Sequence, residues 1–495
     1  MPLVIPSLYK QTRRAHDRNF RSGFFGSMLV LLFLFSSTRA TALGGFGPDT
    51  PAVASGVPSW MDQAIFYEIF PRAFSPAGTL NGVTAKLDNL QKLGVNVLWL
   101  MPIHPIGKIK KIGTYGSVYA VSDYYAIDPD LGTKDDLLHL VQAAHERHMR
   151  VILDEVPDHT AWDSVMMSHP AYYKRDAAGK VLYPHNWTDV AALNYADPSL
   201  RKYMVDMFAY WLKTFDLDGF RCDDAGDVPK TFWDETSSTL RAIRPDVLML
   251  AEASQPDLLR QDFNIDYAWP LLETMNEVIM HGKPASAVRD EIRMQEARFP
   301  AGSWHMLISD DHDTQRAIVR YGAQAALAAS ALVFTLPGAP MLYNGMEVGD
   351  VTPSTAPALF EKVPIFWPSG QMERAFPEFY KVMIPLRETS PALRHGELVW
   401  IHNSDEDHIV TYLRRSQEET VLVAVNLANV PFVGSIEAGL GPWKEVALES
   451  FAQHGEAGMP TAQASAPPPP TALPTLSLPP FGVRIFRTSQ DITAQ

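Results

Sequence analysis

The feature that most constrains this chain is a regular alternation between short apolar runs and amphipathic stretches. Stretches such as VTAKLDNLQKLG (83–94) have the apolar spacing of a helix and lie between the runs. Short, nearly continuous apolar runs are typical of strands in a parallel sheet whose two faces are covered by helices. Eight of them predict an α/β fold, a (β/α)8 TIM barrel, in which the sixth strand has the weakest pattern. The runs are residues 64–70, 95–103, 150–156, 219–223, 247–253, 264–269, 304–309 and 340–345.

A doubly wound open sheet is the alternative fold for this alternation. That fold commonly carries a glycine-rich nucleotide loop directly after its first strand. No such loop follows residues 64–70. We therefore expect the barrel, and we assign it to residues 59–395.

Two further regions extend the barrel. Residues 158–198 separate the third apolar run from the next helical stretch, and a connection of this length is usually functional. We expect it to form a small subdomain, inserted after the third strand, over the mouth of the barrel. From residue 396 the pattern changes to short strands such as VTYLRR and TVLVAVNL with turn residues between them. This pattern predicts a C-terminal all-β domain, a β-sandwich over residues 396–495.

The N-terminal residues have the pattern of an export signal. Basic residues precede the apolar run FFGSMLVLLFLF (24–35), and small residues follow at Ala40 and Ala42. This order predicts a signal peptide over residues 1–42, followed by a lead-in linker over residues 43–58. We therefore expect a secreted or periplasmic protein with no stable membrane insertion after cleavage, although an uncleaved anchor is the alternative.

Composition excludes several classes of partner and site. The net charge of −14 argues against nucleic acid, whose binding depends largely on Lys and Arg contacts to phosphate. The single cysteine excludes an intrachain disulfide framework and a cysteine-based zinc site. A neutral substrate is compatible with this charge.

Acidic residues follow four of the predicted strands. In a barrel of this type the chemistry lies at the carboxyl ends of the strands. Four strand ends that carry acids would surround one mouth with like charges, and a cost of this kind tends to be kept for function. These strand-end residues are Asp154, Asp158 and His159 at or just after the end of the third run, Arg221 and Asp223 at the end of the fourth, Glu252 at the end of the fifth, and Asp311, His312 and Asp313 just after the seventh.

The stretch DLDGFRCDDAGD (216–227) contains the most crowded of these acids. Arg221 and Asp223 are two residues apart and therefore point to the same side of a strand, whereas Cys222 points toward the helical layer. A neighbouring cation lowers the pKa of a carboxylate, so we expect Arg221 to hold Asp223 ionised, as a nucleophile requires.

The other four acids of this stretch are predicted to have no part in the chemistry. Asp216 and Asp218 precede the strand and are expected to be solvated at the opposite end of the barrel. Asp224 and Asp227 follow it and are expected to be ordinary loop or helix-start acids.

The order of these motifs resembles the α-amylase family, glycoside hydrolase family 13. The resemblance extends from about residue 60 to residue 490, and it is specific because many blocks occur in the family's order. These blocks include YEIFPRAF, VILDEVPDHT, GFRCDDAG, LAEAS, DDHDTQR and TLPGAPMLYNGMEVG.

The resemblance implies a retaining glycosidase that cleaves α-glucosidic bonds in starch-like α-glucans or malto-oligosaccharides. It assigns the nucleophile to Asp223, the general acid/base to Glu252 and the third acid, which holds the distorted sugar, to Asp313. It also assigns contacts with the sugar to Tyr119, His159 and His312, and contact with the nucleophile to Arg221. Asp154 is assigned structural support of the site.

The chain departs from the family pattern at two positions. Asp158 and Asp311 stand where the family usually has asparagine before a histidine, so each adds a carboxylate near the site. The resemblance requires no cofactor. It leaves a calcium site open, with Asp158 and Asp189 as candidate ligands, because calcium prefers carboxylate oxygens.

Two other functions fit the same residues. A transglycosylase or sugar isomerase on this scaffold would share the covalent intermediate. A non-catalytic, membrane-anchored ectodomain would suit the apolar N-terminal run, but such proteins typically lack part of the catalytic set, which this chain keeps.

Overall fold

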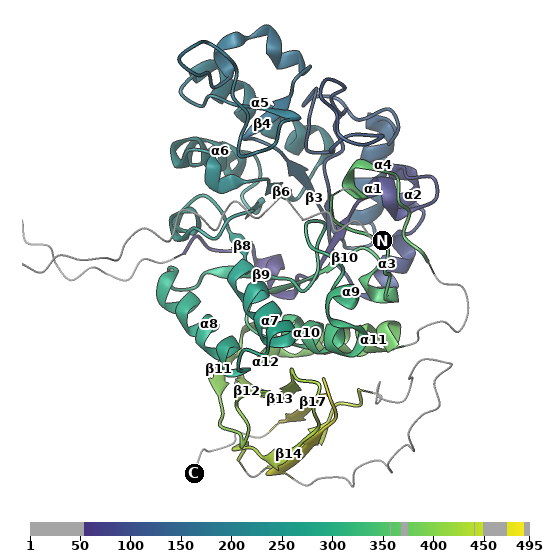
Figure 1. The fold of residues 1–495 in the computed structure, drawn as a ribbon, viewed down its shortest axis with the longest axis vertical. Coiled ribbons are helices and arrows are strands. Elements are labelled where there is room, and N and C mark those ends of the chain that lie inside the picture. The colour runs from purple at the N-terminus through teal and green to yellow at the C-terminus, as the bar shows by residue number, and fades with distance from the viewer. Residues whose placement is uncertain (1–53, 357, 368–374, 440, 449–472, 490–495) are drawn as a thin grey trace, which may run out of the picture.

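The computed structural model describes residues 54–356, 358–367, 375–439, 441–448 and 473–489. The predicted signal peptide and most of the lead-in linker lie outside these residues. Within them, a barrel with a subdomain at one end and a β-domain at the other forms an elongated molecule (Figure 1). Among these residues, no helix combines the length and the apolar character that crossing a membrane requires.

Eight parallel strands close into a barrel, as the alternation of apolar runs predicts. The sixth run, whose pattern is the weakest, forms a strand of three residues, and every residue of that strand is buried. In order around the barrel the strands are β1 (Phe66–Ile69), β10 (Ala339–Tyr343), β9 (Trp304–Leu307), β8 (Ile265–Tyr267), β7 (Leu248–Ala251), β6 (Gly219–Cys222), β3 (Arg150–Glu155) and β2 (Val97–Leu100).

Helices cover the outside of the barrel, and local sequence fixes where they begin. At α4 the Thr133 side chain accepts from the Asp136 backbone while the Asp136 side chain accepts in return, which forms a capping box. At α5 Asp197 caps the first turn and Pro198 occupies its first position, where a missing N–H costs nothing. The main helices are α3 (Leu87–Leu93), α4 (Lys134–His145), α5 (Pro198–Phe215), α6 (Lys230–Ile243), α7 (Trp269–His281), α8 (Ser286–Arg298), α10 (Ala323–Thr335) and α11 (Ala375–Thr389). Shorter ones are α1 (Pro71–Phe74), α2 (Leu80–Thr84), α9 (Ala317–Tyr321) and α12 (Pro391–His395).

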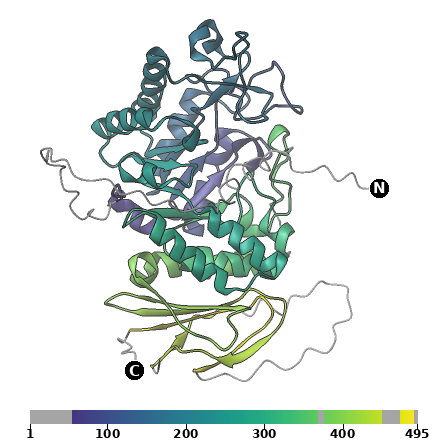
Figure 2. The same ribbon diagram turned by 60° about the vertical axis from the view of Figure 1, so that its left-hand side comes forward.

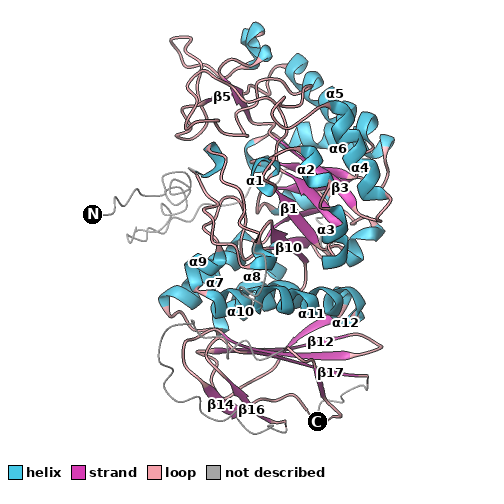
Figure 3. Cartoon of the chain, turned by 90° about the vertical axis from the view of Figure 1, so that its right-hand side faces the viewer, coloured by secondary structure: helices cyan, strands magenta, loops and turns pink. Residues whose placement is uncertain are grey.

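The long connection after β3 folds as a separate lobe, as predicted. Its regular structure consists of two short antiparallel strands, β4 (His159–Ala161) and β5 (Val190–Ala192), and two 3-10 turns. The lobe lies at the end of the molecule opposite the C-terminal sheets (Figure 3). His159 is both the first residue of β4 and a predicted site residue, so the lobe contributes a side chain to the predicted site.

The C-terminal domain contains a five-stranded and a two-stranded antiparallel sheet. The larger sheet is covered on one face by barrel helices, below which it lies in Figure 2, and on the other by the smaller sheet. Residues of β12 and β13 alternate between these two cores, since Tyr412 and Val423 face the barrel while Leu413 and Leu422 face the smaller sheet. The strands are β11 (Glu397–Trp400), β12 (Ile409–Arg415), β13 (Thr420–Asn426), β17 (Val483–Thr488) and β15 (Lys444–Glu445), with β14 (Phe432–Ser435) and β16 (Thr475–Leu478) in the smaller sheet.

Candidate active site

Three neighbouring strands bring the predicted acids to one edge of the barrel. β3 pairs with β6 and β6 with β7, and the register places Asp154 beside Arg221. Asp223 and Glu252 each follow directly after the last residue of β6 and β7. Since the two strands end at the same level, these two carboxyl groups lie side by side at the mouth.

Arg221 is the common partner of these acids. Its side chain is fully buried, and its guanidinium contacts three carboxylates at once. A planar group with several donors holds carboxylates in fixed directions, so one cation orients the whole set. The contacts are 2.8 Å to Asp154, 2.7 Å to Asp223 and 2.8 Å to Glu252.

The carboxyl groups of Asp223 and Glu252 form a closely spaced pair. One carboxylate oxygen of each, together with one of Asp224, lies within 4.8 Å of the others. The backbone N–H of Asp224 donates to Oε2 of Glu252 at 3.0 Å. The same oxygen of Glu252 lies against Arg221, so two donors fix the direction of this carboxyl group.

Burial raises the pKa of Asp223 well above its usual range. Arg221 opposes this rise, as the sequence predicts, but Glu252 adds to it. The prediction counts the cation, which does lower this pKa, and leaves out desolvation, which raises it; that Asp223 is ionised stays a prediction. Two acids this close titrate as a unit.

Asp154 lies beneath the pair and supports it. Its carboxylate accepts from Arg221, from Nε1 of Trp99 at 3.0 Å and from the hydroxyl of Tyr119 at 3.2 Å. Burial raises its pKa to about 6, and Arg221 opposes the rise. These contacts fit the structural role that the family resemblance implies for Asp154.

Tyr119 and His312 form the opposite wall of the site. Their rings stack with centroids 5.4 Å apart, and the Tyr119 hydroxyl lies 2.8 Å from Nε2 of His312. Nε2 is also 3.3 Å from the carboxylate of Asp313, while Nδ1 contacts the buried carboxylate of Glu68. Burial alone would lower the pKa of His312, but Asp313 and Glu68 outweigh it and raise that pKa to about 9. The imidazole therefore carries a positive charge between two acids.

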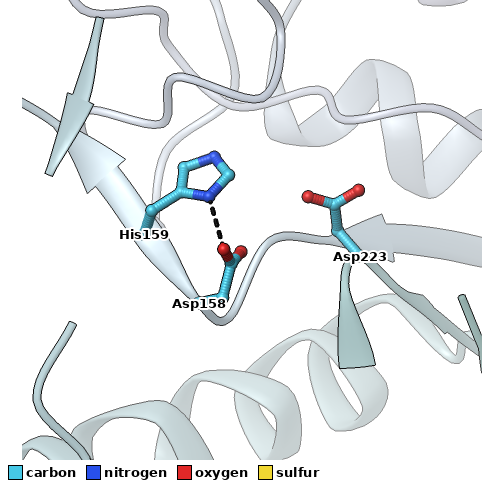
Figure 4. Close-up of side chains that lie close together, drawn as sticks. All are labelled: Asp158, His159 and Asp223. Carbon is cyan, nitrogen blue, oxygen red and sulfur yellow. Dashed lines mark hydrogen bonds and ion pairs between the residues drawn. The ribbon is translucent and has the colours of Figure 1, made fainter. Parts of the chain in front are cut away.

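His159 is held by its neighbour in the sequence. Nδ1 of His159 lies 2.8 Å from Asp158, and Nε2 lies 3.0 Å from the backbone carbonyl of Tyr119. Figure 4 shows the His159 ring above Asp158, with the carboxylate of Asp223 on the other side of the gap. One ligand atom from each of these three residues lies within 4.8 Å of the others. The aspartate at position 158 thus gives His159 a charged partner.

The calcium assignment stays a prediction. Asp158 and Asp189 are both buried, and each has one carboxylate oxygen without a hydrogen-bond partner. Orphaned carboxylate oxygens fit a hard cation, which prefers six to eight oxygen ligands. Asp189 is, however, absent from both clusters of ligand atoms found among the described residues.

The predicted residues line one open cleft of about 620 Å³. All of the predicted catalytic and sugar-contacting residues except Arg221 form its wall, and Arg221 lies directly beneath them. Several residues that the sequence did not single out complete it. These are Ser117, His185, Trp187, Asp224, Ala356, Leu359 and Phe360.

The protein-family model for the alpha-amylase catalytic domain matches residues 68–190 and 176–381 of this chain. These ranges contain most of the barrel, the inserted lobe and the cleft. The chain belongs to the alpha-amylase family.

Three similar proteins are amylases by name. The chain is 28% identical over 426 residues to the alpha-amylase MalA of Haloarcula japonica, which covers 80% of this chain and 61% of that relative. It is 28% identical over 420 residues to the intracellular maltogenic amylase of Bacillus subtilis, covering 75% and 70%, respectively. The crystal structure of a maltogenic alpha-amylase, AmyB of Thermotoga neapolitana, superposes with a TM-score of 0.71 at 29% identity, over 78% of this chain and 90% of that one. The chain thus spans less than two thirds of the length of the first of these relatives.

Among the site residues that the sequence analysis missed, Glu68 and Asp224 hold the predicted ones in place. Glu68 is buried on β1 and contacts His312, and the signal for it was a single charge inside the apolar run 64–70. Asp224 was expected to be an ordinary loop acid, but it is buried, lines the cleft and donates to Glu252. Its left-handed backbone, with φ of 37°, turns its N–H toward Glu252, and the sequence gives no sign of that turn.

Proposed function

We propose that this protein is a retaining glycosidase that hydrolyses α-glucosidic bonds in starch-like α-glucans or malto-oligosaccharides. The observation that carries the proposal is the spacing of Asp223 and Glu252, whose oxygens approach within 4.8 Å. Retaining glycosidases place their two carboxyl groups about 5 to 5.5 Å apart, whereas inverting enzymes need about 6.5 to 9.5 Å to admit a water molecule.

The two acids divide the work by position. Asp223 attacks the anomeric carbon and forms a covalent glycosyl ester, while Glu252 gives a proton to the leaving oxygen. Glu252 then removes a proton from the water that breaks the ester. Two carboxyl groups this close titrate as a pair, which favours one protonated acid and one carboxylate, as this division requires.

The surrounding residues act on the sugar in the proposed reaction. Arg221 orients the nucleophile, and Asp313 binds the hydroxyls of the ring as it flattens toward the transition state. His159 and His312 donate hydrogen bonds to the same ring. The Tyr119 ring, stacked on His312, forms the platform beneath it.

Names of similar proteins support the substrate class. An alpha-amylase and two maltogenic amylases, all between 28% and 29% identical, match most of this chain. The signal-like N-terminus supports export, which we propose as well. We also propose that Asp158 and Asp189 would hold a calcium ion, with a structural role outside the reaction.

A product analysis tests the proposed reaction. The purified protein, Asp223→Asn and Asp216→Asn would be incubated with starch, pullulan, maltotriose and trehalose. We expect hydrolysis by the protein and by Asp216→Asn, whose side chain is exposed, and none by Asp223→Asn. Proton NMR of the first product should show the α-anomer, since two displacements retain the configuration.

Other outcomes would decide against the proposal. A β-anomer would show an inverting enzyme. Longer or rearranged products would indicate a transglycosylase or isomerase, and no reaction from the folded protein would indicate a non-catalytic ectodomain. For calcium, an unfolding temperature that is the same in calcium and in EDTA would refute the ion site.

A further inference from the structure

Two loops at the mouth of the barrel are joined to each other beside the cleft. Residues 108–116 follow β2, and residues 358–362 follow β10; together they are called the β2–β10 wall. The backbone N–H of Tyr115 donates to the carbonyl of Phe360 at 2.9 Å. Phe360 also lines the cleft, so this wall is one of the boundaries of the cleft.

Close packing holds the two parts of the β2–β10 wall together. The backbone N–H of Thr114 donates to the carboxylate of Glu361 at 2.9 Å. Gly113 lies so close to Phe360 that a Cβ atom at position 113 would be 2.6 Å from the Cβ of Phe360. The backbone of Gly113 has a φ of 67°, which also favours glycine. Both the contact and the conformation therefore depend on glycine at this position.

The β2–β10 wall is also tied to the segment after β1 and to the inserted lobe. Arg72 of α1 lies over the ring of Tyr115 at 5.1 Å, and its Nη1 is 3.5 Å from the carbonyl of Leu359. On the other side, the backbone N–H of Lys108 donates to the carboxylate of Asp163 in the lobe at 2.8 Å. The wall therefore connects the lobe with the segments after β1, β2 and β10.

The position of the wall around the barrel relates it to the proposed reaction. In the order of strands, β1 lies diametrically opposite β7, and its two neighbours are β2 and β10. Glu252 follows β7, so the β2–β10 wall is on the far side of the mouth from the proposed acid. Glu252 protonates the oxygen that joins the attacked sugar to the leaving group. The leaving group therefore extends toward β7, and the rest of the donor chain extends toward the wall.

We propose that the β2–β10 wall ends the donor side of the cleft, so that the protein cleaves glucans near their non-reducing end and releases short products of one length. The attacked anomeric carbon belongs to the sugar on the non-reducing side of the bond, so the donor side holds the non-reducing end of the chain. A fixed boundary there rejects a longer donor by a clash. This inference rests on the proposed function and specifies which bonds of the substrate the same site reaches.

Two substrates that differ only at the non-reducing end test the inference. One is p-nitrophenyl α-maltoheptaoside, and the other carries a 4,6-O-ethylidene group on its terminal glucose. Chromatography would follow the first cleavage of each by the full chain. We expect one short maltosaccharide to be released first from the free substrate. The blocked substrate should be cleaved about 100-fold more slowly, because a displacement of about 1 Å from the productive position can cost this much.

Two variants should open the β2–β10 wall. Phe360→Ala removes a side chain that borders the cleft, and Gly113→Ala forces the two parts of the wall apart. We expect each to raise the ratio of kcat/KM for the blocked substrate to that for the free one by about 10-fold or more. A variant that is merely less stable would lose activity on both substrates and keep the ratio. Phe366→Ala is the matched control, because Phe366 is 61% exposed and does not line the cleft.

Each contrary result has a separate meaning. Equal cleavage of the free and blocked substrates by the parent protein would overturn the role of the wall and leave the proposed glycosidase intact. A ratio that stays at the parent value in both variants would also overturn that role. A parent protein that cleaves neither substrate would overturn the proposed function and this inference together.

Discussion

The buried carboxylate of Glu68 lies on β1 against Nδ1 of His312. Burial raises its pKa to about 7, and the imidazolium of His312 opposes that rise. Glu68 does not line the cleft, so its effect on a bound sugar passes through the histidine. At the scale of single residues, Glu68 therefore acts by stabilising the protonated form of His312.

Replacement of Glu68 by glutamine should move the alkaline limit of activity to lower pH. The change removes one of the three acids that raise the pKa of His312, so burial, which lowers this pKa, has more influence. A nearby opposite charge commonly shifts a pKa by about 1 to 3 units, and we expect a fall of about one unit or more. The measurement is the pH profile of kcat/KM for the protein and Glu68→Gln, with the His312 ring followed by NMR. An alkaline limb that does not move would show that another group sets it.

Sequence reasoning found the residues whose position follows from the strand rule and missed those that depend on tertiary packing. Asp223 and Glu252 were found because they follow apolar runs. Glu68 was missed because a charge inside an apolar run could also indicate the end of a strand or an exposed edge. His185 and Trp187 lie in a connection whose path over the mouth no local pattern determines.

At the scale of the element, the two ends of β6 carry acids with different environments. Asp218 was predicted to be solvated, and this is wrong, since its side chain is 1% exposed. It accepts from Arg150, Arg244 and His145 and from the backbone of Val151 at the start of β3. Asp216, two residues earlier, is 67% exposed, as predicted. The sequence did not distinguish the two because the partners of Asp218 come from β3, α4 and the end of α6.

Asp218→Asn should destabilise the barrel far more than Asp216→Asn. The change leaves Arg150 without its carboxylate partner, while Arg244 and His145 keep only the exposed Asp216. Breaking a buried ion pair costs about 3 to 5 kcal/mol, and we expect the lower end because these cations are part-exposed. An exposed acid usually contributes less than about 1 kcal/mol. Urea unfolding of both variants and of the parent protein would measure the difference, and equal losses would refute the anchoring role of Asp218.

At the scale of the whole molecule, a buried arginine joins the barrel to the C-terminal sheet. Arg414 on β12 donates to the carbonyl of Thr335 at the end of α10 and to that of Gly396. Arg387 on α11 donates, within the barrel, to carbonyls next to the same helix end, including that of Leu336. A cation near the carboxyl end of a helix also meets its negative dipole end. The sequence predicted the β-domain but gave no sign of this junction, since arginines on strands and helices are usually solvated.

Arg414→Met should weaken this junction, whereas Arg415→Met should not. Arg414 is 1% exposed, and the next residue, Arg415, belongs to the opposite side of the strand and is less buried. Loss of Arg414 leaves buried carbonyls unsatisfied, which costs about 1 to 3 kcal/mol for each group. Limited proteolysis and thermal unfolding would compare the variants. Equal behaviour would mean that apolar packing alone joins the domains.

The acids of the barrel mouth also set how the stability of the whole protein depends on pH. Burial raises the pKa of Asp154 to about 6 from 3.8 and that of Glu68 to about 7 from 4.5. The pKa of His312 rises to about 9 from 6.5, because the effect of Asp313 and Glu68 outweighs that of burial. Between the ordinary and the folded pKa, the folded state binds more protons than the unfolded state, so stability falls as pH rises. The contribution of His312 to the free energy of unfolding is complete below pH 6.5 and is lost as the pH rises toward 9.

The unfolding temperature should therefore be highest near pH 5 and fall on the order of 5 °C toward pH 9. Asp223→Asn should be more stable than the parent protein at pH 8, because it removes a buried acid whose pKa is raised and which faces Glu252. At pH 5 the difference should be smaller, since the raised pKa of Asp223 means that less of this acid is charged at lower pH. Thermal unfolding at pH 5, 6.5, 8 and 9 would give both curves. Two results would contradict this prediction: a maximum at pH 8 in the parent protein, or an Asp223→Asn variant that is less stable than the parent at pH 8. Either would show that the crowded acids do not destabilise the fold and that Arg221 alone balances their charges.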